Sequence, residues 1–127
     1  MGEKQRPNLT EAELRIMRVL WKRREASVNG VLEAIETPRL ARNTVQTMLG
    51  ILERKGYVRH RTDGRAFVYR AAVSEDAVQH AVLNDTVSRF FGGSAERLVM
   101  RLVDPERISK KDVDRIRQLL GGEGAKE

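Results

Sequence analysis

The chain has 127 residues, no cysteine and a net charge of +6. This length corresponds to one domain, or to one small domain with an appended segment. The lack of cysteine excludes disulfides, thiol catalysis and cysteine-ligated metals, and the only histidines, His60 and His80, are too few and too far apart for a metal site. Because no long apolar run or signal peptide is recognisable, we expect a cytoplasmic chain without metal or cofactor.

The positive charge is concentrated in the first part of the chain. Residues 1–73 hold 15 Lys and Arg against 8 Asp and Glu, whereas residues 74–127 hold 9 against 10. Within residues 37–70 there are 8 basic and 2 acidic residues. This asymmetry indicates that the first part meets a polyanion, of which nucleic acid is the simplest for a chain without a membrane anchor. A generic basic surface is the alternative.

Two short helices are expected before residue 39. Thr10 and Glu13 form the T-x-x-E capping box of the first, whose apolar positions run to Trp21, interpreted as a core residue. Ser27 is the expected N-cap of the second helix. That helix should end at Thr37-Pro38, because the residue before proline avoids the helical conformation.

Residues 41–57 are the stretch around which the rest is organised. Apolar residues recur there at i, i+3, i+4 and i+7, which predicts a helix with one buried face: Val45, Met48, Leu49 and Leu52. A second face carries amides and hydroxyls rather than Glu–Lys pairs: Asn43, Gln46, Thr47, Gly50 and Arg54. Asn, Gln and Thr can contact base edges in DNA, so the pattern favours a helix-turn-helix with this stretch as recognition helix. An ordinary exposed helix is the alternative.

Beyond Gly56, which should end this helix in the left-handed conformation, the apolar period changes from 3.6 to 2. Residues 58–61 and 66–70 flank Thr62-Asp63-Gly64-Arg65, which predicts a β-hairpin with Asp-Gly in a type I′ turn. Arginines follow the hairpin and its tip: Arg59, Arg61, Arg65 and Arg70. A basic hairpin directly after a recognition helix is typical of the wing of a winged helix. We expect the Phe67–Tyr69 pair to pack on the helices and His60 to be a polar strand residue, with a pH switch as the alternative.

From residue 74 the pattern is purely helical. Three serines are expected N-caps, Ser74, Ser94 and Ser109, and breaks are expected at Gly92-Gly93, Asp104-Pro105 and Gly121-Gly122. Such short apolar helices cannot bury their faces alone, so a second copy of the chain is the expected partner. The candidate dimer-interface residues are Val82, Val87, Phe90, Leu98 and Leu102.

The fold expected from these patterns is mainly α with a small β-hairpin wing. A winged-helix DNA-binding domain over residues 1–73 precedes a helical dimerisation region over residues 74–127. The sequence contains no G-x-S-x-G, H-E-x-x-H or phosphate-binding Gly-Lys-Ser motif, and its acidic residues stand at helix starts, where capping explains them. We therefore expect that the chain is not an enzyme.

Four segments together resemble the penicillinase repressor family, also called BlaI/MecI/CopY: AELRIMRVLW, RNTVQTMLGILERKGYV, DGRAFVYRAAVS and FGGSAERLVMRLV. The resemblance extends over residues 9–120. Members are homodimeric winged-helix repressors of dyad operators upstream of β-lactamase, resistance or copper-export genes. The resemblance implies that the wing arginines contact the DNA backbone and that five side chains enter the major groove: Arg42, Asn43, Thr44, Gln46 and Thr47.

The resemblance has two consequences for regulation. The copper-responsive branch carries C-terminal Cys-x-Cys motifs, which this chain lacks, so copper sensing is excluded. In the β-lactam branch a membrane-anchored metalloprotease cuts the dimer region, at a bond that corresponds to Arg101–Leu102. Arg101 replaces the asparagine of well-studied members at this bond.

The sequence is best interpreted as a dimeric, sequence-specific DNA-binding repressor. One alternative is a winged-helix module for protein interaction, because a fold alone does not define a function. The Asn/Gln/Thr face and the basic wing favour DNA, since a docking face would be more apolar at its centre. A second alternative is a non-specific architectural DNA binder, which would bind specific and random DNA with nearly equal affinity.

Overall fold

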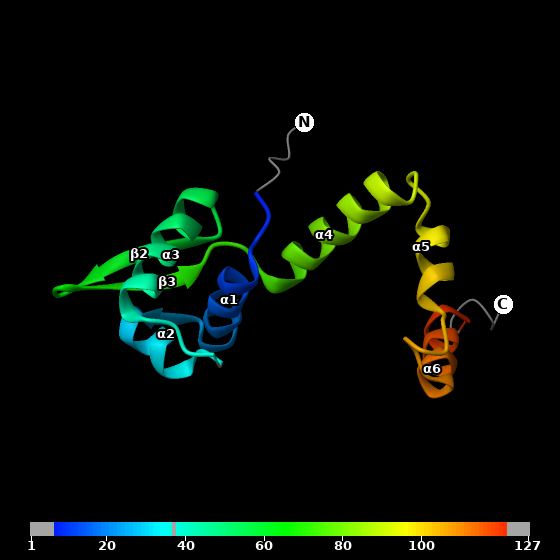
Figure 1. Ribbon diagram of the computed structural model, residues 1–127, viewed down its shortest axis with the longest axis horizontal. Coiled ribbons are helices and arrows are strands. Elements are labelled where there is room, and N and C mark those ends of the chain that lie inside the picture. Colours follow the sequence, from blue (N-terminus) through cyan, green and yellow to red (C-terminus); the bar gives the residue numbers. More distant parts are fainter. Residues whose placement is uncertain (1–6, 37, 122–127) are drawn as a thin grey trace. The chain divides into compact units, whose positions relative to one another are not determined.

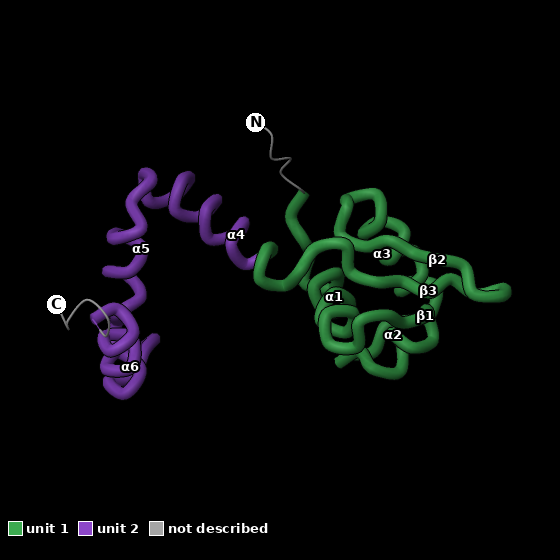
Figure 2. The backbone as a smooth tube through the Cα atoms, turned by 180° about the vertical axis from the view of Figure 1, so that it is seen from behind, with its two compact units in different colours: residues 1–78 green, residues 79–127 purple. Residues whose placement is uncertain are grey.

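The computed structural model describes residues 7–36 and 38–121. The chain divides into two compact units, residues 1–78 and residues 79–127 (Figure 2). The first unit contains α1 (Glu11–Arg23), β1 (Glu25–Ser27), α2 (Val28–Ala34), α3 (Arg42–Lys55), β2 (Val58–Asp63) and β3 (Ala66–Ala71) (Figure 1). Helix α4 (Glu75–Phe90) starts in the first unit, and the second unit also contains α5 (Ala95–Leu102) and α6 (Lys110–Gly121).

The two predicted N-caps of the first unit are confirmed. Thr10 accepts a hydrogen bond from the Glu13 backbone N–H, and the Glu13 carboxylate accepts one from the Thr10 N–H, which completes the capping box of α1. Ser27 accepts from the Gly30 N–H at the start of α2. Helix α2 ends at Ala34, earlier than predicted, and Thr37 of the expected stop signal lies outside the described residues.

The core of the first unit joins the three helices to one face of the sheet. The largest fully buried side chains are apolar and come from α1, α2, α3 and β2: Ile16, Met17, Leu20, Leu49, Leu52, Val31, Val45 and Val58. The periodicity of residues 41–57 is thereby confirmed, with Met48 only partly buried. Trp21 is also half-buried at the edge of this core, rather than fully enclosed.

The sheet has three strands in the order β1-β3-β2, one more than the predicted hairpin. In β1, Ala26 pairs with Tyr69 of β3, and both side chains are buried. Side chains alternate across a sheet, so this row faces the helices and the neighbouring row, Arg59–Arg70–Glu25, lies on the opposite face.

The turn of the hairpin differs from the predicted type I′ turn around Asp-Gly. Asp63 belongs to β2 and pairs with Ala66, so the turn consists of Gly64 and Arg65. Only Gly64 has a positive φ, of 66°, whereas a type I′ turn needs two such residues. Glycine at the first central position is the residue that makes this two-residue connection possible.

Helices α4, α5 and α6 begin at the serines that were predicted as their N-caps. Ser74, Ser94 and Ser109 each accept a hydrogen bond from a backbone N–H three residues later. Gly92 and Gly93 both have positive φ, so the helical conformation is interrupted between α4 and α5. The last helix includes Gly121, and Gly122 of the predicted stop lies outside the described residues. No described residue of α4, α5 or α6 is buried.

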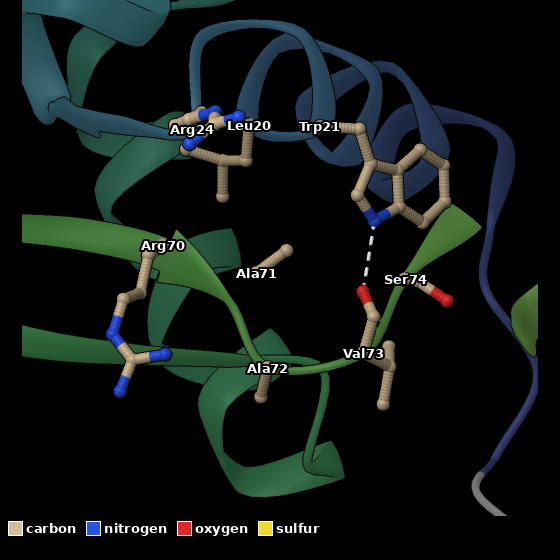
Figure 3. A pocket seen from close by; sticks show the side chains of 8 residues that line it. All are labelled: Leu20, Trp21, Arg24, Arg70, Ala71, Ala72, Val73 and Ser74. Carbon is tan, nitrogen blue, oxygen red and sulfur yellow. Dashed lines mark hydrogen bonds between the residues drawn. The ribbon is translucent and has the colours of Figure 1, made fainter. Parts of the chain in front are cut away.

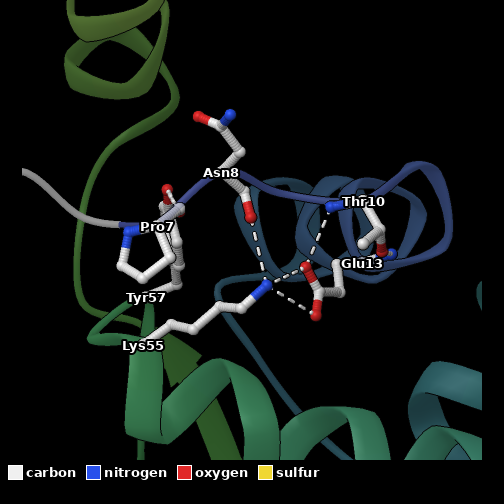
Figure 4. Close-up of polar contacts among 6 residues, drawn as sticks. All are labelled: Pro7, Asn8, Thr10, Glu13, Lys55 and Tyr57. Carbon is white, nitrogen blue, oxygen red and sulfur yellow. Dashed lines mark hydrogen bonds and ion pairs between the residues drawn. The ribbon is translucent and has the colours of Figure 1, made fainter.

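A partly buried ion pair, between half-buried Lys55 and buried Glu13, joins the end of α3 to the start of α1 (Figure 4). Lys55 Nζ donates to both carboxylate oxygens of Glu13, at 2.8 and 3.0 Å, and to the Asn8 carbonyl at 3.0 Å. The Tyr57 hydroxyl donates to the Pro7 carbonyl at 2.6 Å, which holds the same N-terminal segment against the end of α3. Burial raises the pKa of Glu13, but the bonds from Lys55 and Thr10 outweigh it and leave the pKa lowered.

Replacing Glu13 by glutamine should therefore destabilise the first unit in a pH-dependent way. A lowered carboxyl pKa contributes stability above the unfolded-state pKa of about 4.3, and this contribution is lost as the pH falls. We expect Glu13→Gln to lower the free energy of unfolding by roughly 1–3 kcal/mol at pH 7, because Lys55 loses its counterion. The difference from the wild type should shrink below about pH 4, as denaturant titration at several pH values would show.

Glu11→Gln is the matched control, because Glu11 is an exposed acid in the same first turn of α1. Glu11→Gln should lower the free energy of unfolding by only a few tenths of a kcal/mol, because it removes a negative charge that interacts favourably with the helix dipole. Equal losses for the two variants would contradict the assignment of the ion pair.

Candidate nucleic-acid interface

The polar face of α3 is exposed at every position except Gly50, which is half-buried. Its apolar face is closed against the core by Val45, Leu49 and Leu52. The five side chains predicted to enter the major groove and the DNA-binding candidate Arg54 of the same face are all exposed: Arg42, Asn43, Thr44, Gln46, Thr47 and Arg54. Helix α3 therefore presents amide, hydroxyl and guanidinium groups together on one surface, which are the groups that read base edges and bind phosphates.

Side-chain bonds fix the start of α3 against α1 and α2. Arg42 Nε donates to Asn29 Oδ1 of α2 at 3.2 Å, so this predicted DNA contact also joins the two helices of the helix-turn-helix. Arg15 of α1 donates to the carbonyls of Glu36 and Pro38, which belong to the connection between α2 and α3. The sequence did not reveal either bond, because both join residues far apart in the chain.

The wing is joined to the end of α3 through His60. His60 Nδ1 lies 2.8 Å from Glu53 Oε1, and its ring stacks on Phe67 with centroids 4.1 Å apart. Tyr69 is buried as expected, and burial followed by the Glu53 charge raises its pKa. Phe67 is 46% exposed, so only one member of the aromatic pair packs on the core. His60 thus lies in β2 as a polar strand residue, as predicted, and in addition links the wing to the end of α3.

Two of the wing arginines, Arg61 and Arg65, differ in whether they bond to another residue of the chain. Arg61 donates to Glu25 of β1 at 2.8 Å; this bond raises the pKa of Arg61 and lowers that of Glu25. Both side chains are exposed, so the pair contributes little to stability. Arg65 lies in the exposed turn at the tip, and no hydrogen bond to another described residue holds it. Of the wing arginines predicted to contact the DNA backbone, Arg65 is therefore better placed than Arg61.

The second unit exposes large apolar side chains on all three helices. Of the candidate interface residues, Val82, Phe90 and Leu102 are exposed, whereas Val87 and Leu98 are half-buried. Further exposed residues that the sequence did not single out are Met100 and Leu119. The Arg101–Leu102 bond lies in the last turn of α5, and the Arg101 carbonyl accepts a hydrogen bond from Arg107 at 2.7 Å.

Neither a metal site nor a membrane span occurs in the described part of the chain. No group of three or more acidic or histidine side chains is close enough there to hold an ion. None of its helices is sufficiently long and apolar to cross a bilayer.

A three-stranded sheet with a basic hairpin after an exposed third helix defines a winged-helix protein. The family model described as "Penicillinase repressor" matches residues 9–122. The chain belongs to the penicillinase repressor family.

Curated relatives are matched over nearly their full length. The chain is 29% identical over 115 residues to the penicillinase repressor of Bacillus licheniformis, covering 90% of each chain. It is 25% identical to the methicillin resistance regulatory protein MecI of Mammaliicoccus sciuri, covering 88% of this chain and 92% of that protein. The solution structure of the DNA-binding domain of the repressor BlaI is 36% identical, with a TM-score of 0.51 over 57% of this chain and 90% of that one.

Two glycines of this interface should respond in opposite ways to the same substitution. Gly56 ends α3 with φ 91°, where a side chain is strained, so Gly56→Ala should lower the free energy of unfolding by about 1 kcal/mol. Gly50 lies inside α3, and a Cβ atom there meets nothing within 4 Å. Gly50→Ala should therefore raise the free energy of unfolding by roughly 0.5–1 kcal/mol. Thermal and denaturant unfolding measure both, and a shift of the same sign in the two variants would contradict these local assignments.

Proposed function

We propose that the chain is a DNA-binding transcriptional repressor that reads its operator with the exposed face of α3. The observation that carries the proposal is the combination of this polar face with an unpaired arginine at the wing tip, Arg65. Base-edge readout needs amides and hydroxyls, whereas phosphate binding needs cations close by. The family's name and the BlaI DNA-binding domain support the same function. The proposal assigns no catalytic step to the chain.

Base readout and backbone binding can be separated by two substitutions. Gln46→Ala should weaken operator binding by about 1–3 kcal/mol per half-site and leave binding to random DNA nearly unchanged, because it removes base contacts. Arg65→Ala should weaken both almost equally and reduce the salt dependence, because it removes a phosphate contact. The operator is first selected from random DNA, and both variants are then titrated on it and on a scrambled duplex.

Glu33→Gln, on the exposed side of α2, is the control that should change neither affinity. If Gln46→Ala weakened both duplexes alike, α3 would not be the reading helix. Equal affinity of the wild type for operator and scrambled DNA would instead favour an architectural DNA binder. No DNA binding at all would favour a protein-interaction module.

The second unit is proposed to form a homodimer. One winged helix covers too few base pairs for useful specificity, whereas a two-fold dimer reads two half-sites of a dyad operator. The exposed apolar side chains of α4 and α5 support this role: Phe90 is 69% exposed and Leu102 is 46% exposed. Such surfaces are typical of interfaces, since water-exposed apolar area is unfavourable. The proposed interface comprises Val82, Val87, Phe90, Leu98 and Leu102.

Disrupting the dimer should weaken operator binding without unfolding the first unit. Phe90→Asp places a charge that would have to be desolvated in the interface, so we expect a monomer. Its operator affinity should fall by at least about 100-fold through lost avidity. Ser88→Asp adds the same charge at another exposed position of α4 and should leave the dimer intact. Sedimentation beside operator titration tests both variants, and full operator affinity of a monomeric Phe90→Asp variant would refute the dimer mechanism.

The regulated genes are proposed to be β-lactamase or other antibiotic-resistance genes, as the names of the two relatives suggest. A membrane-anchored sensor protease is the proposed partner for induction, with Arg101–Leu102 as the cleaved bond. Cutting there would divide α5 and leave α3 and the wing unchanged. Incubation with such a protease, followed by mass spectrometry, would identify the bond.

A further inference from the structure

Arg42 is the first residue of α3, and a side chain of α2 orients it. Its Nε donates a hydrogen bond to Asn29 Oδ1 at 3.2 Å. Both side chains are exposed, so packing in the core does not hold either of them. The hydrogen bond therefore determines where the guanidinium of Arg42 lies. Asn29 itself is not among the residues that the sequence predicts to contact DNA.

Other exposed arginines of the first unit are not oriented in this way. Figure 3 shows Arg24 and Arg70, whose guanidinium groups form no hydrogen bond with the residues drawn there or with any other described residue. A long exposed side chain loses conformational entropy when one conformation is fixed. For Arg42 the bond to Asn29 fixes the side chain before DNA binds, so less of this entropy remains to be lost on binding.

The bond orients Arg42 without compensating its charge or occupying its end. Asn29 is a neutral amide, and no carboxylate among the described residues forms an ion pair with Arg42. The bond engages Nε, so the two terminal nitrogens, Nη1 and Nη2, can donate two parallel hydrogen bonds to O6 and N7 of a guanine. Arg61 is the contrasting case, because its terminal Nη2 binds the Glu25 carboxylate.

The backbones that carry Asn29 and Arg42 are held by other contacts. The Ser27 hydroxyl caps α2 one residue before the helix starts. Val31 of α2 and Val45 of α3 are both fully buried in the same core. Asn29 is therefore needed to orient the Arg42 side chain rather than to hold the two helices together.

We propose that Asn29 is a positioning residue, which holds Arg42 so that it reads one guanine in each half-site of the operator. The first residues of a recognition helix contact base edges. Bidentate recognition of guanine needs a guanidinium in a defined plane, whereas a phosphate accepts a cation from many directions. The fixed side chain thus favours a base contact over a phosphate contact for Arg42. This inference rests on the proposed function, because it concerns how α3 reads DNA.

The guanine is identified by comparing the sequences that the wild type and Arg42→Ala select from random DNA, both as full chains. One guanine of the half-site should lose its preference in Arg42→Ala. At this position the wild type should favour guanine over adenine by about 5- to 100-fold per half-site. The base 7-deazaguanine keeps its pairing but lacks the N7 acceptor, and it should weaken wild-type binding by at least about threefold per half-site.

Asn29→Ala is the decisive variant. It should lower the preference for guanine by at least about fivefold at this position and leave the preference at other positions unchanged. In an Arg42→Ala background it should have no further effect, because Asn29 acts through Arg42. It should also unfold at nearly the wild-type temperature, since Asn29 is exposed. Glu33→Ala removes another exposed polar side chain of α2 and should leave the preference for guanine as in the wild type.

A wild-type preference for guanine in Asn29→Ala would overturn the inference. So would an equal effect of Asn29→Ala in the presence and absence of the Arg42 side chain. If Arg42→Ala weakened every duplex alike, Arg42 would be a phosphate contact, and the inference would again be wrong. The proposed function would survive these three results. Equal wild-type affinity for operator and scrambled DNA would instead contradict the proposed function, and the inference with it.

Discussion

The direction of the recognition helix depends on one partly buried ion pair, Glu13 with Lys55. Apolar packing of Val45 and Leu49 holds α3 on the core, but hydrophobic burial has no direction and does not set where the helix ends. Lys55 fixes the position of this end in space, because its three hydrogen bonds join the last turn of α3 to Glu13 in the first turn of α1 and to the Asn8 carbonyl. Glu13 is the one buried charged residue among those the structure describes, and losing either partner would leave a charge without its counterion. A residue far from the polar face therefore helps to orient it.

Contacts within the chain also engage several of the basic residues in positions 37–70. Lys55 and Arg61 are engaged with carboxylates, and Arg42 binds Asn29. These cations maintain the geometry of the winged helix, whereas Arg65 and Arg54 remain exposed for a polyanion. The number of basic residues therefore overestimates the number of phosphate contacts. A cation that is already bonded within the protein must give up that bond before it can bind a phosphate.

Features determined by neighbouring residues could be predicted from the sequence, and features determined by distant residues could not. The serine and threonine caps and the positive φ of Gly56 were predicted because each depends on at most four consecutive residues. Strand β1 was missed because its three residues, Glu25–Ser27, are too few to show alternation, and its partner β3 lies some forty residues further on. The bonds of His60 to Glu53 and of Arg61 to Glu25 were missed for the same reason. The exposed face of α3 was predicted correctly because helical periodicity fixes both faces at once.

The helices of the second unit do not bury their apolar side chains against one another. Helix α5 has eight residues, fewer than an isolated helix needs for stability in water, and no described residue of α4 to α6 is buried. Its helices therefore need a partner surface, and in the proposed dimer association and ordering of this unit are one linked equilibrium. The Arg101–Leu102 bond lies inside α5, where the Arg101 carbonyl is hydrogen-bonded to Arg107. A protease that cut this bond would need α5 to open, and opening is what dimerisation opposes. The dimer partner and the protease would thus compete for the same short helix, so the strength of the interface would set the rate of cleavage.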